Sequence, residues 1–334
     1  MTTLPPLVKA AASESPTKRA LKRFRKNTLA MISLAFVAII TVVSLVSLVK
    51  TPQDPYAINK GQGFRPPSWA AGAVDAAKFP ETPNHFFLGS DELGRDVFSR
   101  LLKGGMMSLS VGFLATFVAL LIGVTWGLFA AFKGGATDQV MMRFVDILYS
   151  LPYMFFVILL AAVSSDIVDS LDKHLIKGGH HLPDWLKTNI LIFVLFFAIG
   201  AVSWLTMSRI VRGQVLSLKQ KEFVEAARAL GVPTRRILFS HILPNCLGPI
   251  IIYSTLTVAV VILEESFLSF IGLGVQPPFA SWGTLAADGA QGISVYATRW
   301  WLVFFPGLMI TSTLMAINFV GDGLRDAFDP RLSR

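Results

Sequence analysis

Residues 29–49 read LAMISLAFVAIITVVSLVSLV, an apolar run without a charged side chain. About 20 apolar residues are enough to cross the hydrocarbon core of a bilayer as a helix. Six basic residues precede the run between Lys18 and Lys26. The run is nevertheless longer than the apolar region of a secretory signal peptide, and no small-residue cleavage site follows it. It therefore predicts an uncleaved first transmembrane helix.

The rest of the chain repeats this pattern. Of its 334 residues, 53% are hydrophobic and 15% charged, whereas soluble domains carry about 25% charged residues. In lipid the backbone polar groups must be satisfied within the segment, so each long apolar run should be a helix. We therefore expect an all-α membrane protein with six transmembrane helices. The further runs are residues 109–132, 140–163, 190–207, 249–270 and 301–320.

The placement of positive charge predicts the orientation. With the N-terminus in the cytoplasm, nineteen of the 30 lysine and arginine residues fall on the cytoplasmic side. Such a bias favours cytoplasmic N- and C-termini. The predicted segments are a cytoplasmic N-terminal segment, the first transmembrane helix, an extracytoplasmic loop, a five-helix core and a cytoplasmic tail: 1–28, 29–49, 50–108, 109–320 and 321–334.

The segment between the fourth and fifth runs is a candidate docking element. Residues 219–231 read KQKEFVEAARALG and are rich in good helix formers. Phe223, Ala227 and Leu230 fall on one face of that helix at helical spacing. The small side chains of Ala226 and Ala227 would let another backbone approach closely. A basic surface loop that binds anionic lipid is the alternative interpretation.

The end of this helix is also marked in the sequence. Gly231 suits the left-handed position just past a helix C-terminus. Pro233 suits the first turn of a second short helix, which we expect Pro244 to end before the fifth span. Together the two helices form a predicted helix–turn–helix in the cytoplasm.

The spacing of these residues resembles the EAA loop of bacterial ABC importer permeases. That resemblance implies that the loop, residues 209–247, docks into a partner ATPase and transmits its motion. The family usually has an apolar residue where His241 stands. The implied coupling residues are Glu225, Ala226, Ala227, Gly231, His241, Leu243 and Pro244.

Other stretches are similar to the dipeptide/oligopeptide/nickel branch of those permeases. They read LGSDELGRD at 88–96, ESFLSFIGLG at 265–274, SWG at 281–283 and NFVGDGLRD at 318–326. Within the branch the chain looks most like the C-type subunit of oligopeptide permeases, although Met106 stands where those proteins commonly have arginine. The resemblance implies a type I ABC importer permease fold in the bacterial cytoplasmic (inner) membrane.

The same resemblance implies a non-enzymatic subunit of an ATP-driven peptide importer, most like those for oligopeptides. Its implied partners are a homologous B-type permease subunit, two ATP-binding subunits, an extracytoplasmic peptide-binding protein and membrane lipid. It implies no cofactor, metal or nucleic acid. The chain lacks the GxxxxGK[ST] phosphate loop, so ATP hydrolysis is expected on the separate subunits.

Alternatives remain at this level. Within the branch, the substrate could be a dipeptide, nickel or another small solute. Outside it, a proton-coupled secondary transporter would be expected to show inverted repeats, which are not evident. An intramembrane hydrolase would need a motif such as HExxH or GxSxG, and neither occurs.

Glu264 and Glu265 interrupt the fifth apolar run. Carboxylates at membrane depth are costly and usually face a cavity, so one of them could receive a substrate's ammonium group or gate the pathway. The favoured interpretation instead ends the span there and places both at the outer interface, because Gly272 and Gly274 follow soon after.

Three further groups of residues carry weaker signals. Arg143 and Asp146 predict a local ion pair at the start of the third span, and Pro152 predicts a kink within it. The histidine- and aspartate-rich stretch at 166–181 matches no standard metal-ligand spacing and is interpreted as a solvated outside loop. The charged stretch at 91–96 is interpreted as a mixed-charge turn at a helix start on the outer face. The two stretches contain Asp166, Asp169, Asp172, His174, His180 and His181, and Asp91, Glu92, Arg95 and Asp96.

Overall fold

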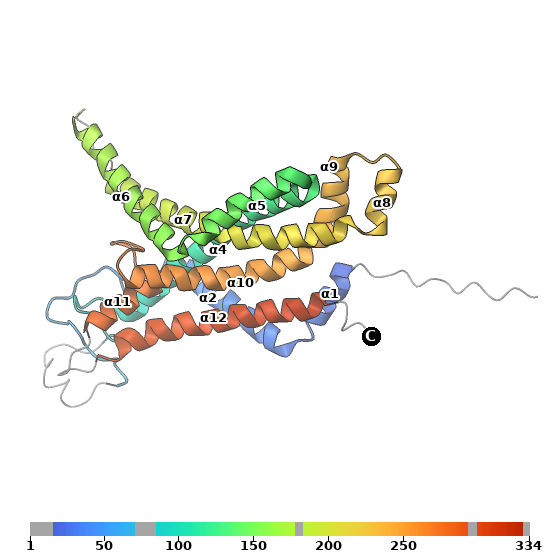
Figure 1. Ribbon diagram of the computed structural model, residues 1–334. Coiled ribbons are helices and arrows are strands. Elements are labelled where there is room, and N and C mark those ends of the chain that lie inside the picture. Colours follow the sequence, from blue (N-terminus) through green and yellow to red (C-terminus); the bar gives the residue numbers. More distant parts are fainter. Residues whose placement is uncertain (1–15, 71–84, 178–182, 293–298, 330–334) are drawn as a thin grey trace, which may run out of the picture.

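The computed structural model describes residues 16–70, 85–177, 183–292 and 299–329, and their regular structure is helical (Figure 1). A single isolated bridge pairs Ser90 with Asp96 among these residues. The all-α expectation is therefore confirmed. The helices are α1 Pro16–Phe24, α2 Thr28–Val46, α4 Val97–Lys133, α5 Gly135–Ser150, α6 Tyr153–Lys177, α7 Asp184–Lys219, α8 Glu222–Ala229, α9 Thr234–Arg236, the π-helix η1 Ile237–Ile242, α10 Leu243–Phe270, α11 Trp282–Gly292 and α12 Trp301–Phe328.

Within the described residues, five helices are long and apolar enough to cross a membrane, and a sixth is added if α5 and α6 form one bent span. Several helices extend well beyond their apolar runs. The helix α4 begins at Val97, not at residue 109, because the Asp96 carboxylate caps it by accepting a 2.8 Å hydrogen bond from the Ser99 N–H. The apolar runs therefore located the spans but not the helix ends.

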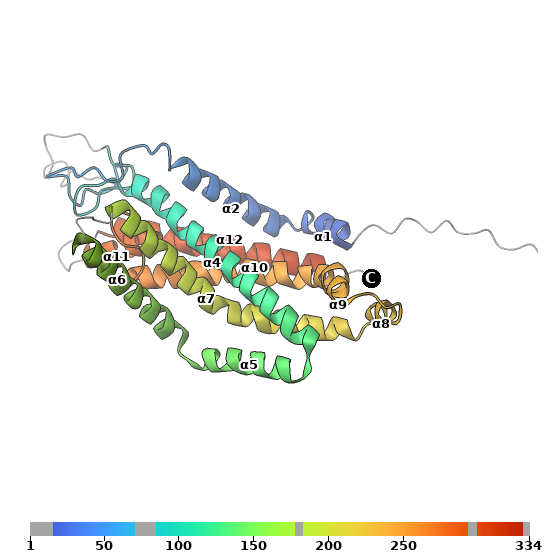
Figure 2. The same ribbon diagram turned by 90° about the horizontal axis from the view of Figure 1, so that it is seen from above.

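The third span is broken, where a kink was expected. The axes of Gly135–Ser150 and Met154–Leu160 differ by 87°, so α5 and α6 form two separate arms (Figures 1 and 2). Leu151, which precedes Pro152, has extended backbone angles of −77° and 142°. Proline disfavours the helical conformation of the residue before it, which explains the break.

The stretch expected as a solvated loop is helical over most of its described part. Asp166, Asp172 and His174 lie on α6, which runs to Lys177. His180 and His181 lie outside the described residues.

The centre of the bundle is the contact between α4 and α7, which cross closely (Figure 2). Small residues recur at every fourth position of α4, and all of them are buried: Ala115, Ala119, Gly123 and Gly127. A Cβ atom added to Gly127 would lie 2.4 Å from the carbonyl oxygen of Ser208 on α7. Small residues at such a stripe let membrane helices pack backbone to backbone. The α4–α7 pair therefore forms the scaffold on which the other helices are arranged.

One end of the bundle carries α8, α9, α1 and the last turns of α12 (Figure 1). Ala20 and Phe24 of α1 are buried in a cluster with Val320 and Ala327 of α12. The Arg23 guanidinium also donates a 3.2 Å hydrogen bond to the carbonyl oxygen of Asp329. The start of α1 and the end of α12 thus share one end of the molecule with the segment that resembles an EAA loop.

The opposite end carries α11 and the start of α4. There the Asp91 carboxylate accepts hydrogen bonds from the Arg95 N–H and Nε, at 2.9 and 2.7 Å, and from the Arg100 guanidinium. Arg100 also donates to Asp288 on α11 at 3.3 Å. This geometry confirms the predicted mixed-charge turn and helix start. It adds a link to α11 that could not be seen in the sequence.

Candidate coupling surface and translocation cavity

The turn after α8 requires a left-handed residue. Gly231 has a φ angle of +71°. The Val232 N–H donates to the Ala227 carbonyl at 3.0 Å, and the Gly231 N–H donates to the Arg228 carbonyl at 2.9 Å. These two hydrogen bonds define a Schellman motif, which commonly places glycine at this position. A Cβ atom here would meet nothing within 4 Å, so backbone conformation, not space, favours glycine.

The two faces of α8 differ in burial. Val224 and Ala227 are buried in a cluster with Val211 and Val215 of α7. Phe223 and Leu230 are instead 41% and 83% exposed, so of the three residues that share a face by spacing only Ala227 is buried. The helix is turned so that the valine–alanine ridge meets α7. The solvent-exposed face then offers Glu225 and Ala226 together with the two exposed apolar side chains.

The second short helix does not end at Pro244, contrary to expectation. Helical backbone runs without a gap from Thr234 to Phe270. Its Ile237–Ile242 turn is a π-helix, which contains His241, and the Leu243 N–H donates to the Leu238 carbonyl. Pro244 therefore lies inside this continuous helix, directly after the π-helical turn and in the first turn of α10. As a result the loop is joined to α10 by continuous helix.

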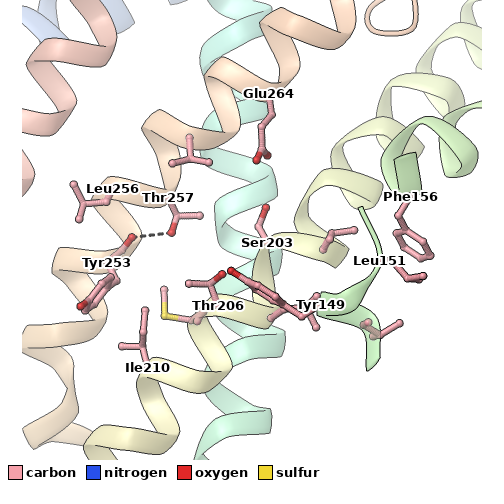
Figure 3. Close-up of a pocket in the computed structure, with 15 residues that line it drawn as sticks. Tyr149, Leu151, Phe156, Ser203, Thr206, Ile210, Tyr253, Leu256, Thr257 and Glu264 are labelled. Carbon is pink, nitrogen blue, oxygen red and sulfur yellow. Dashed lines mark hydrogen bonds between the residues drawn. The ribbon is translucent and has the colours of Figure 1, made fainter. Parts of the chain in front are cut away.

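A cavity of about 530 Å³ lies beside α10, between α7 and the break that separates α5 from α6 (Figure 3). Its wall is mostly apolar and includes five hydroxyl side chains and one carboxylate. None of the lining residues in the described part of the chain is basic. The lining residues are Leu148, Tyr149, Leu151, Phe156, Val202, Ser203, Leu205, Thr206, Met207, Ile210, Tyr253, Leu256, Thr257, Val260 and Glu264.

The α10 wall of the cavity follows a helical stripe. Tyr253, Thr257, Val260 and Glu264 are separated by four, three and four residues and so fall on one face. In Figure 3 the Glu264 carboxylate lies at one end of this stripe and Tyr253 toward the other. In the sequence the stripe is visible as the polar residues Tyr253, Thr257 and Glu264 at helical spacing, of which only Glu264 was predicted as a candidate pathway residue. The opposite wall, Tyr149 of α5 and Ser203 and Thr206 of α7, carries no comparable signal.

Glu265 has a different environment from its neighbour. It is completely buried, and its carboxylate accepts hydrogen bonds from Ser108 Oγ at 2.9 Å and from Ser269 Oγ at 2.6 Å. The helix continues beyond it to Phe270. The helix therefore does not end at the two acids, and Glu265 is enclosed by protein. Consecutive residues on an α-helix point about 100° apart, which separates the cavity-lining Glu264 from the buried Glu265.

Two ion pairs hold α5 against α7 beside the cavity. The Asp138 carboxylate accepts two 2.7 Å hydrogen bonds from Arg212. Asp146 accepts a 2.8 Å hydrogen bond from Arg209, whose guanidinium also lies 4.1 Å from the centre of the Tyr149 ring. The predicted local pair of Asp146 with Arg143 is therefore wrong, because α7 offers a partner across the helix contact. These contacts place Tyr149 at the cavity wall.

The apolar helix bundle, with an exposed helical hairpin at one end and a cavity beside α10, has the architecture that a membrane permease requires. Residues 123–334 match the family model described as the inner membrane component of binding-protein-dependent transport systems. Residues 15–67 match the N-terminal transmembrane domain of oligopeptide transport permease C. The chain belongs to this family of multi-pass ABC importer permeases, as its sequence motifs predicted.

The relatives agree with this assignment. The chain is 46% identical over 252 residues to the oligopeptide transport system permease protein OppC of Haemophilus influenzae, covering 75% of this chain and 72% of the relative. It is 40% identical over 317 residues to OppC of Bacillus subtilis, covering 95% and 90%. It is also 39% identical over 322 residues to the dipeptide transport system permease protein DppC of Bacillus subtilis, covering 96% and 88%.

A solved structure shows the same fold. The methionine ABC transporter MetNI, described in inward-facing conformations, contains a chain that aligns with a TM-score of 0.50 at 16% identity. The alignment covers 68% of this chain and 95% of that chain. This similarity supports the type I permease fold expected from the sequence.

Proposed function

We propose that this chain is one transmembrane subunit of an ATP-driven peptide importer, that it forms half of the pathway, and that α8 and η1 dock onto a partner ATPase. The observation that carries the proposal is the continuous helix from Thr234 to Phe270. One end of it belongs to the exposed hairpin, and the other lines the cavity through Glu264. A force applied to α8 therefore has a direct structural route to the pathway.

The length of α10 makes this route effective. Leu243 and Glu264 are 21 residues apart, or roughly 30 Å along a helix at 1.5 Å per residue. ATP-driven closure of the ATPase subunits would displace α8, and α10 would tilt as a rigid rod and reshape the cavity wall. Because the two states would differ in their contacts at α8, ATP binding can shift the equilibrium between them.

The proposed assembly contains a homologous B-type permease subunit, two ATP-binding subunits and an extracytoplasmic peptide-binding protein. The second permease would complete the pathway, to which this chain contributes the cavity beside α10. Glu225, Ala226 and Gly231 would meet the ATPase directly or shape the contact. His241, Leu243 and Pro244 would act through the stiff junction with α10.

The orientation follows from the docking end. Since ATPase subunits are cytoplasmic, the end that carries α8 is proposed to face the cytoplasm. The start of α1 and the end of α12 lie at that same end (Figure 1), which supports cytoplasmic termini and agrees with the lysine and arginine bias. Residues 50–96 would then lie outside.

Oligopeptides are the proposed substrate class, supported by the N-terminal domain match and the OppC relatives. The DppC relative favours dipeptides as the second candidate. Both can be tested in proteoliposomes that contain this subunit and its partners. ATP-dependent uptake of a labelled tetrapeptide, unaffected by a protonophore and weakly competed by dipeptides, is the expected result. Uptake without the ATPase subunits that a protonophore abolishes would overturn the proposal.

A further inference from the structure

The cavity beside α10 is lined by an acidic side chain and by no basic one among the described residues. Its volume of about 530 Å³ lies within the range of small-ligand sites, roughly 300–1,000 Å³. Hydroxyl groups from α5, α7 and α10 can exchange hydrogen bonds with a neutral polar backbone. Glu264 supplies the one carboxylate among the lining residues, and the described part of the lining includes no basic side chain.

Glu264 and its neighbour Glu265 lie in different environments. Glu265 is fully buried and holds Ser108 and Ser269 in hydrogen bonds. Glu264 is half-buried and turned toward the cavity, as Figure 3 shows. An ionisable residue within a membrane span is costly unless it faces a cavity and serves a function there.

We propose that Glu264 is a specificity-determining residue that receives the ammonium group at the amino terminus of a peptide as it passes through the cavity. The carboxylate offers acceptors to the ammonium group, and the tyrosine and threonine hydroxyls accompany the following peptide units. This inference rests on the proposed peptide importer and assigns that importer a site for the cationic end of its substrate.

The test uses the complete importer in proteoliposomes and two peptides of identical sequence, one with a free amino terminus and one N-acetylated. The affinity of the binding protein for each peptide is measured first, and uptake is compared with the binding protein saturated. Because the same binding protein serves every variant, a changed preference must arise in the permease.

Glu264→Gln is expected to lower uptake of the free peptide about tenfold relative to the acetylated one, the size of a hydrogen bond between charged groups. Glu264→Asp, which keeps the charge, should retain most of the wild-type preference. Glu92→Gln is the control for loss of one acidic group, because Glu92 is exposed and lies outside the cavity. It should leave the preference unchanged.

Two outcomes overturn separate claims. If wild-type importer transports both peptides and Glu264→Gln affects them equally or not at all, the assignment of Glu264 is wrong and the proposed function stands. If the wild-type assembly shows no ATP-dependent uptake of either peptide, the proposed function itself is wrong. Equal recovery of the assembled complex for each variant shows that folding is not the cause.

Discussion

Ser108 on α4 donates a 2.9 Å hydrogen bond to the carboxylate of Glu265 on α10, at a site where both residues are completely buried. The same hydroxyl oxygen accepts a 3.2 Å hydrogen bond from the backbone N–H of Trp282 at the start of α11. A residue of α4 thus connects two other helices through one atom. Glu265, the α10 member of this junction, is the direct neighbour of Glu264, the proposed substrate-binding residue.

The first prediction concerns this junction. Glu265→Ala should destabilise the protein by about 2 kcal/mol or more, because it leaves two buried hydroxyl groups without their acceptor and removes packed volume. Thermal unfolding in detergent would show a lower Tm. Leu263→Ala is the matched control on the same helix, since Leu263 is 53% exposed. Equal Tm values for the two variants would contradict the structural role of Glu265.

The second prediction concerns the turn after α8. Gly231→Val should leave membrane abundance unchanged and abolish ATPase association and peptide uptake, because a β-branched residue is disfavoured at positive φ by about 1–2 kcal/mol. Gly231→Asn should retain more activity, since asparagine tolerates the left-handed conformation. Abundance is read by immunoblotting and association by co-purification. Normal uptake by Gly231→Val would refute the docking role of this loop.

The third prediction concerns the ion pair that joins α5 to α7. Asp138→Asn and Arg212→Gln should each destabilise the protein. Arg212→Gln leaves the Asp138 side chain, which is 11% exposed, without its charged hydrogen bonds, and Asp138→Asn does the same to the partly exposed Arg212. The double variant should lose less than the sum of the two, with a coupling of about 1–3 kcal/mol. A double-mutant cycle on unfolding free energies measures this term. Strict additivity would show that the pair contributes nothing.

The fourth prediction concerns orientation. A cysteine at Lys60 should react with an impermeant maleimide in intact cells, whereas a cysteine at Lys221 should react only after permeabilisation. Both positions are exposed in the structure, so access to solvent does not separate them. The native Cys246 is buried and should contribute little background. The reverse labelling pattern would invert the proposed topology.

The sequence alone was sufficient for the class and the family. Long apolar runs can be satisfied in lipid only as helices, and the residues from Glu225 to Pro244 carry a spacing specific enough to predict the permease family. Gly231 was predicted correctly because a left-handed helix end depends on local backbone preference. Asp96 and its capping role were accessible for the same reason.

The tertiary structure decided what depends on neighbours distant in the chain. The partner of Asp146 is Arg209, 63 residues away, so local spacing to Arg143 was misleading. Pro244 continues a helix because the π-turn before it changes the hydrogen-bond register. Glu264 and Glu265 are adjacent in the sequence, yet one lines a cavity and the other is buried. Packing against α4, α5 and α7 makes that difference, because it determines which side of α10 is enclosed by other helices and which side lines the cavity.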